Sequence, residues 1–320
     1  MLQTATQTRQ AGTTLRVGIG VKQGPDALEA VLAAAAMARE ELDGATPHLA
    51  IVVTTAVPQG DLTRSVRSVF GPVGFTGGVT AGLLTPQGLV REGALVIGVS
   101  NAEGAASGVA ATNGRRLADA AQAAARLVLA GWPFRGRYPR GISFAFTGHG
   151  SGAASTGFLA NWRELMGPKM RTVCGTMTTP TVFGATSTPA LASVGSLEAP
   201  YLMGLGVAEG NTQDTSTDVL IHNTVDATRT ALKWLEGHPA RLVVAMESAA
   251  RFRALGTDAE REWAAIREQV QQHDGLSGAC VGWLCDEVAA YGRGVHPVDL
   301  PGALVVAALG DATRDSERLG

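Results

Sequence analysis

Short apolar runs alternate along the chain with longer segments whose apolar positions recur every three or four residues. Such runs are typical of buried strands, and such segments are typical of helices that cover a sheet. The helix predicted between Pro25 and Asp43 has an alanine-rich apolar face, which favours close packing against a sheet. This alternation predicts the α/β class.

One pattern occurs three times: an apolar strand, a helix that starts with a polar residue, a glycine-bearing strand and a further apolar strand. The copies run from Ala50 to Ser100, from Ile142 to Val207 and from Arg241 to Leu309. Copies roughly a hundred residues apart are too long for a solenoid, whose units have about 20 to 50 residues. We therefore expect internally repeated βαββ modules that form mixed sheets flanked by alanine-rich helices, in two lobes with a cleft between them.

The start of the chain also predicts a domain boundary. The strand and helix expected over Leu15–Asp43 are echoed by a strand at TSTDVLIH and a helix over Asn223–Glu236. This echo places the boundary within Asn211–Thr215. The predicted division is a flexible tail at 1–14, a first domain at 15–211, a second domain at 212–310 and a flexible tail at 311–320.

Composition limits the classes of partner. The 320 residues include 26 basic and 28 acidic side chains, with a net charge of −2 and no basic block, so nucleic acid is not an expected partner. No apolar run approaches the ~18 residues of a membrane helix, and the polar N-terminal segment has no hydrophobic signal core. We therefore expect a cytoplasmic protein without a membrane partner.

The three cysteines, Cys174, Cys280 and Cys285, are odd in number and form no C-x-x-C pair. This pattern argues against a disulfide framework and against a zinc ribbon, and no metal site is predicted. All three fall in or near glycine-bearing strands. A thiol there either fills the core, which is the ordinary position for a small buried cysteine, or lines a cavity.

Two glycine-rich segments follow predicted strands. Gly18–Gly24 has the wrong glycine spacing for a dinucleotide-binding loop, so we interpret it as a tight turn. Thr147–Gly152 contains His149 at a strand-to-helix transition, where backbone amides and an imidazole can meet a ligand. It resembles the oxyanion loop of serine hydrolases, but the chain has no G-x-S-x-G nucleophile elbow. A flexible loop with an exposed histidine is the alternative.

Charged residues follow the apolar strands of the third copy. Glu247 and Arg251 follow one strand, and Asp286 and Glu287 follow the next. Side chains at equivalent strand ends converge on one rim of a sheet. They form either an ion pair or the polar lining of a pocket, and the sequence leaves both interpretations open.

Several of these segments resemble the FIST family. The C-terminal likeness lies in LVVAMESAARFRALG, GLSGACVGWLCDEVAAYGRG and GALVVAAL, where Arg251, Leu255, Gly256 and Glu287 match. The family's cysteine is replaced around Ser248, and its glycine before the glutamate is Asp286. The N-terminal likeness lies in VGIG, the alanine-rich helix and GFTGGVTAGLL, again without the family's cysteine.

The resemblance implies an intracellular sensory protein with paired N-terminal and C-terminal FIST domains that bind a small ligand. Some relatives bind haem and report nitric oxide to histidine kinases. For this chain the ligand-binding candidates are Thr76, Cys174, Arg251 and Glu287. If the ligand is haem, His149 and His296 are the candidate iron ligands, because both lie in segments that flank strands.

The leading hypothesis is thus a cytoplasmic sensor that binds a small molecule, with haem as one candidate, between its two halves. It would signal through a separate partner, such as a histidine kinase. The alternative is an enzyme, a hydrolase or a haem-dependent catalyst acting on a small metabolite. In that hypothesis His149 is the base, supported by Cys174 or Glu287.

Overall fold

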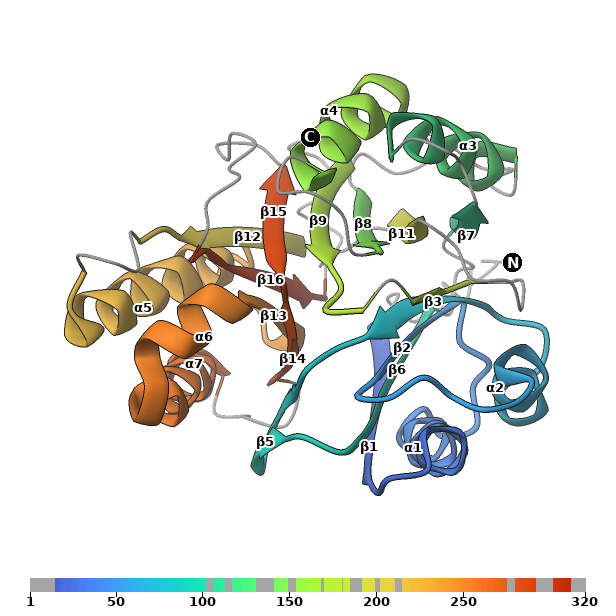
Figure 1. The fold of residues 1–320 in the computed structure, drawn as a ribbon, viewed down its shortest axis with the longest axis horizontal. Helices are drawn as coiled ribbons and strands as arrows, with labels where there is room; N and C mark the ends of the chain where they lie inside the picture. The colour runs from blue at the N-terminus through green and yellow to red at the C-terminus, as the bar shows by residue number, and fades with distance from the viewer. Residues whose placement is uncertain are drawn as a thin grey trace, which may run out of the picture.

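Three β-sheets face a shared interior, and helices cover their outer sides (Figure 1). The computed structural model describes residues 15–101, 106–112, 117–130, 141–148, 154–167, 170–179, 181–184, 192–198, 202–210, 215–274, 280–291 and 302–311. The predicted α/β class is confirmed. None of the helices in these ranges is long and apolar enough to cross a membrane.

The elements fall into three successive units. Unit 1 comprises β1 (Leu15–Gln23), α1 (Ala27–Glu41), β2 (Leu49–Thr54), α2 (Leu62–Phe70), β3 (Gly74–Val79), β4 (Leu83–Thr85), β5 (Gly88–Val90) and β6 (Gly93–Asn101). Unit 2 comprises β7 (Ala106–Thr112), α3 (Leu117–Ala130), β8 (Gly141–Thr147), α4 (Ala154–Met166), β9 (Met170–Thr176), β10 (Val182–Phe183) and β11 (Ala192–Glu198). Unit 3 comprises β12 (Leu202–Ala208), α5 (Thr217–Lys233), β13 (Ala240–Ser248), α6 (Ala249–Leu255), a 3-10 helix (Gly256–Asp258), α7 (Ala259–Asp274), β14 (Cys280–Cys285), β15 (Glu287–Tyr291) and β16 (Leu304–Gly310).

The three sheets share one strand order. The four strands that one unit contributes to each sheet run β1-β6-β2-β3, β7-β11-β8-β9 and β12-β16-β13-β14. In each sheet the first two pairings are antiparallel and the third is parallel. The common unit therefore includes an opening strand and helix that the sequence-based copies leave out.

Each sheet is extended at its parallel edge by a strand from another unit. The β4–β5 hairpin of unit 1 pairs with β14 of unit 3, β15 of unit 3 pairs with β9 of unit 2, and β10 of unit 2 pairs with β3 of unit 1. Figure 1 shows the hairpin extending from unit 1 to α7. The exchange is cyclic, so every unit both gives and receives a strand.

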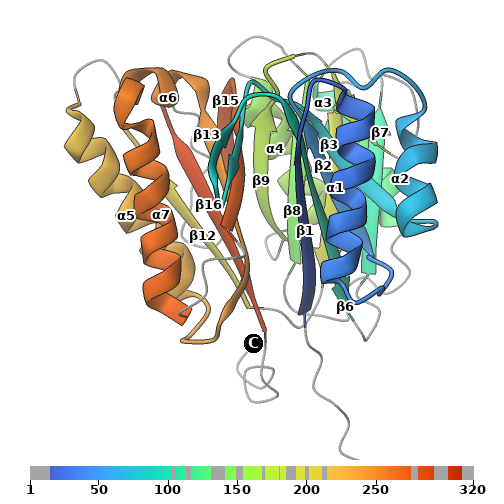
Figure 2. The same ribbon diagram turned by 90° about the horizontal axis from the view of Figure 1, so that it is seen from below.

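The inner faces of the sheets form one apolar core, to which alternate residues of β2, β8 and β13 contribute. Phe146 of β8 stacks on Trp283 of β14, with ring centroids 5.5 Å apart. The intervening residues face the helices, as Ala145 does beneath α3 and α4 and Val243 beneath α5 and α7. Figure 2 shows the sheets between α5 and α7 on one side and α1 and α2 on the other. Burial on both faces explains why these strands are continuous apolar runs.

Gly18 and Gly20 lie within β1, so the predicted tight turn is wrong for these two glycines, whereas Gly24, with a φ of 153°, lies in the bend after the strand. A Cβ atom on Gly18 would lie 1.9 Å from the Ala38 carbonyl oxygen of α1, and one on Gly20 would lie 1.8 Å from that of Ala34. In unit 3, Gly204 and Gly206 stand in the same relation to α5, 1.7 and 1.8 Å from the carbonyl oxygens of Ala231 and Ala227. The glycines thus permit close contact between the first strand and its helix.

The strand predicted at TSTDVLIH is also wrong, because this segment forms the beginning of α5, preceded by Ser216 at its N-cap. Leu220, Thr224, Ala227 and Ala231 of α5 are buried, and their spacing of three or four residues is helical. The strand that opens unit 3 is instead β12, which precedes this segment.

Candidate functional site

The carboxyl ends of β3, β9 and β14 meet at one junction, where the three units contact each other. The backbone N–H groups of Val79, Leu284 and Asp286 donate hydrogen bonds to the carbonyl oxygens of Thr181, Gly82 and Thr176, at 3.1, 3.0 and 2.8 Å. Ligands of α/β proteins commonly bind outside the carboxyl ends of parallel strands. The junction therefore has the position of a candidate ligand site.

Threonine hydroxyls link the strands at this junction. Thr147 and Thr176 are hydrogen-bonded to each other at 3.0 Å, and Thr80 donates to the Leu284 carbonyl oxygen. Glu287 is half-buried here and pairs with Thr176 across β15 and β9. The Thr80 hydrogen bond thus joins unit 1 to unit 3, whereas the Thr147–Thr176 hydrogen bond joins two strands of unit 2.

The other predicted ligand-binding residues lie elsewhere. Thr76 is buried in β3, and its hydroxyl is hydrogen-bonded to that of Ser193 in β11 at 2.8 Å. Cys174 is buried in the apolar cluster beneath α3 and α4. Burial raises the pKa of the Cys285 thiol in the central core. His149 and His296 lie outside the described residues, so their predicted role as iron ligands stays a prediction.

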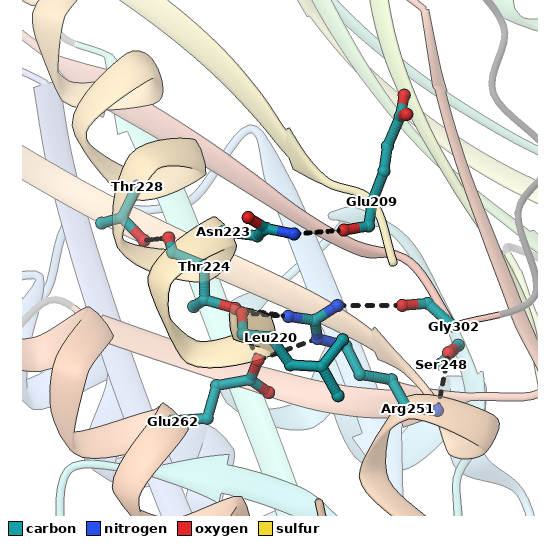
Figure 3. A network of polar contacts seen from close by, with 9 residues as sticks. All are labelled: Glu209, Leu220, Asn223, Thr224, Thr228, Ser248, Arg251, Glu262 and Gly302. Atoms are coloured by element: carbon teal, nitrogen blue, oxygen red, sulfur yellow. Dashed lines mark hydrogen bonds and ion pairs between the residues drawn. The ribbon is translucent and has the colours of Figure 1, made fainter. Parts of the chain in front are cut away.

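Arg251, the remaining candidate, is the centre of a buried polar network (Figure 3). Its Nε donates to Glu262 Oε1 of α7 at 2.8 Å, and its Nη1 donates to the Gly302 carbonyl oxygen at 3.0 Å. Its Nη2 donates to Thr224 Oγ1 of α5 at 2.9 Å and to the Leu220 carbonyl oxygen. One guanidinium on α6 therefore connects α5, α7 and the segment that precedes β16.

A second carboxylate, that of Glu247, lies at the end of β13 and is 3 % exposed. Burial raises the pKa of Glu247 well above its ordinary value, and the charge of Glu262 and a hydrogen bond to it raise this pKa further, while Arg251 opposes the shift. Two carboxylates can hydrogen-bond to each other only if one carries a proton. Glu247 Oε1 and Glu262 Oε2 are buried and have no hydrogen-bond partner among the described atoms.

The ion-pair interpretation of the charged strand ends therefore holds for Arg251, but its partner is Glu262 on α7. Sequence reasoning did not identify Glu262. A signal was present, because Glu262 lies on the buried face of α7 beside Ala259, Trp263 and Ile266. A charged residue within an apolar helical stripe is almost always paired when it is buried.

A groove with a cavity volume of about 210 Å³ lies between the β4–β5 hairpin and the segment of α6 and α7. One wall is the β4–β5 hairpin with the residue after it, and the other is the segment from α6 to the first turns of α7. The residues that line the groove are Leu84, Leu89, Arg91, Phe252, Gly256, Thr257, Ala259, Glu260 and Trp263. They come from both predicted domains, since the first three precede residue 211 and the others follow it.

The hairpin is fixed against α7 by two side chains. Trp263 Nε1 donates to the Thr85 carbonyl oxygen at 2.7 Å, and Arg267 Nη1 donates to that of Pro86. The Arg91 guanidinium lies 5.9 Å from the centroid of the Phe252 ring. In the described part of the chain, neither Arg91 nor Glu260 has an ion-pair partner. The groove thus combines an apolar floor with two available charges of opposite sign.

The groove contains no side chain suited to bind haem iron. Its nine lining residues include no histidine, cysteine, methionine or tyrosine, the usual axial ligands. The residues that line the groove therefore do not fit haem.

No protein-family model and no curated protein sequence matches the chain. Among solved structures, cyanuric acid hydrolase from A. caulinodans is similar at 10% identity, over 94% of this chain and 99% of that chain, with a TM-score of 0.44. PurLQS from Thermotoga maritima is similar at 11% identity, over 94% of this chain and 73% of that chain, with a TM-score of 0.30. TM-scores this low do not establish a shared fold, so no reaction or substrate of these proteins is transferred to this chain.

Proposed function

We propose that this protein binds a small molecule in the groove between the β4–β5 hairpin and α6–α7. The observation that carries the proposal is the origin of the lining residues in units 1 and 3, which are far apart in sequence. Small-molecule sites are typically concave, mostly apolar and located where structural units meet, with a few polar groups that orient the ligand. The groove has each of these properties.

The lining indicates the chemistry of the ligand. Leu84, Leu89 and Trp263 provide an apolar surface, while Arg91 and Glu260 offer one cation and one anion. A volume of about 210 Å³ is below the usual range of roughly 300 to 1,000 Å³ for drug-sized ligands. The ligand class is therefore a small, largely apolar molecule with at least one polar group.

The proposal includes a sensory role, which the FIST resemblance supports. A ligand that contacts both the hairpin and α6–α7 favours conformations in which these walls are close, and a shift in their population is what a partner protein could recognise. The partner would be a separate signalling protein in the cytoplasm, such as a histidine kinase. The enzyme alternative has His149 as its base, supported by Cys174 or Glu287; neither Cys174 nor Glu287 lines the groove, and His149 lies outside the described residues.

The test is a thermal-shift screen of the full chain against small metabolites. A ligand at about 100 times its dissociation constant adds about 2.7 kcal/mol to the free energy of unfolding. Thr257→Trp fills the groove from an exposed lining position, and Ala254→Trp places the same side chain on an exposed position of α6 outside the lining. We expect compounds that stabilise the natural sequence and Ala254→Trp but not Thr257→Trp. A screen without such compounds would reject the groove as the binding site.

A further inference from the structure

The wall formed by α6 and α7 has two functional faces. Phe252 and Trp263 line the groove, while the residues directly before them, Arg251 and Glu262, belong to the buried network. Two successive positions thus connect the groove and the network, once on each helix. A change in the position of α7 relative to β13 must therefore change the shape of the groove.

The charges in the network do not balance unless a proton is present. Glu247 of β13 and Glu262 of α7 are both buried, and each has one carboxylate oxygen without a hydrogen-bond partner among the described atoms, while the other oxygen of Glu262 is paired with Arg251 of α6. The charges of Glu262 and Arg251 act on Glu247, and the charge of Glu247 acts on the Cys285 thiol of β14. The neighbouring residue on β16 is the apolar Leu304, and α5 contributes only the Thr224 hydroxyl, which donates to Glu262 Oε1. Two carboxylates thus share one guanidinium, and a single proton between them removes the excess negative charge.

We propose that binding in the groove is linked to one proton held between Glu247 and Glu262, so that the protonated protein binds its ligand and the deprotonated protein binds it weakly. This inference rests on the proposed function and specifies how the same site is regulated. The proton is released to solvent, and no other bond changes.

The structure indicates which element moves when the proton is lost. Two negative charges then remain beside one guanidinium, in a space that water does not reach. Glu247 is held by β13, which is paired on both sides in the middle of its sheet, whereas Glu262 belongs to an outer helix. Repulsion therefore displaces α7, and with it Trp263 and Ala259 of the groove wall. Ligand affinity falls as the pH rises through the raised pKa of Glu247.

The probe for this test is naphthalene-1-sulfonate, a small fluorescent aromatic dye whose size suits a cavity of about 210 Å³ and whose anionic group does not titrate between about pH 6 and about pH 9. Its dissociation constant is measured by fluorescence for the full chain, for Glu247→Gln and for Thr257→Trp. Loss of binding in Thr257→Trp identifies the groove as the dye site. We expect the dissociation constant of the dye for the natural sequence to be several-fold higher at about pH 9 than at about pH 6. Release of one proton can raise this constant by at most about tenfold per pH unit. Glu247→Gln should bind the dye with the same dissociation constant at about pH 6 and at about pH 9.

The outcomes separate the two proposals. Groove binding that is independent of pH overturns the proton linkage and leaves the proposed function intact. Dye binding that is unaffected in Thr257→Trp argues against the groove itself. In that case hydrogen exchange tests whether α7 moves. After correction for intrinsic exchange rates, the amides of α7 in the natural sequence should exchange faster at about pH 9 than at about pH 6. In Glu247→Gln their corrected exchange rates should be the same at both pH values. Equal protection in both proteins overturns the linkage.

Discussion

At the scale of single residues, Arg251 has the most extensive set of interactions. It is 0 % exposed, and its donors reach α5, α7 and the segment before β16. A buried ion pair adds little to the free energy of unfolding compared with apolar residues of the same size. Loss of one partner, however, leaves a buried charge without a counter-charge. Arg251 therefore fixes which elements lie together beneath the groove.

Replacement of Arg251 with Met should lower the free energy of unfolding by about 3 to 5 kcal/mol, since Glu262 then loses its counter-charge. Urea denaturation measures this change. The matched control is Asp218→Asn, which removes the exposed ion pair between Asp218 and Arg261 and should leave the free energy of unfolding almost unchanged. Similar costs for the two variants would show that the buried network does not stabilise the fold.

Glu247→Gln should reduce the dependence of stability on pH. Because burial, followed by the charge and hydrogen bond of Glu262, raises the pKa of Glu247 above its ordinary 4.5, the unfolded chain releases this proton at a lower pH than the folded chain. The folded protein therefore loses stability as the pH rises between the two pKa values. Denaturation from about pH 5 to about pH 9 should show this loss in the natural sequence and a smaller one in the variant. Parallel curves would refute the shared proton.

At the scale of elements, the first strand and the first helix of a unit are in unusually close contact. Gly204 of β12 faces the Ala231 carbonyl oxygen of α5, and no side chain fits between them. The alanine-rich helices and the paired glycines are both visible in the sequence. Their meaning became clear only in the structure, since a glycine in a strand is also typical of a turn or a bulge.

Gly204→Ala should destabilise the protein by about 1 to 3 kcal/mol, because its Cβ atom would lie 1.7 Å from a backbone oxygen and α5 would have to move. Thermal unfolding measures the effect. Lys22→Ala, an exposed change on β1, should have little effect. A Gly204→Ala protein as stable as the natural sequence would mean that α5 does not pack this closely.

The strands of the fold differ in how clearly the sequence predicts them. The apolar runs of β2, β8 and β13 predicted buried strands, because burial on both faces leaves a clear signal. Two of the strands that cross between units are too short to leave such a signal, because β10 has two residues and β4 has three. The groove lies beside such a crossing hairpin, so its lining residues could not be brought together from the sequence. Glu262 was detectable as a charge on an apolar stripe, but its partner Arg251 is set by tertiary packing.

At the scale of the whole molecule, the cyclic strand exchange ties the three units together. The β4–β5 hairpin of unit 1 pairs with β14, and β9 of unit 2 pairs with β15, so both units depend on strands from unit 3. The same exchange creates the groove, since the hairpin that crosses to unit 3 forms one of its walls. Fold and proposed function therefore depend on one structural feature.

A fragment of residues 1–211 should not fold alone, because β9 and the β4–β5 hairpin lose their partner strands. Circular dichroism and NMR spectra should show a loss of ordered structure, and addition of residues 212–320 should restore it. A well-dispersed NMR spectrum of the isolated fragment would instead show that the first predicted domain is independent of the second.

The most direct test of the central claim is a crystal structure of the full chain with the strongest compound from the thermal-shift screen. We expect electron density for the compound between the β4–β5 hairpin and α6–α7, in contact with Trp263 and with Arg91 or Glu260. Density for the compound at another place in the molecule, with an empty groove, would contradict the account.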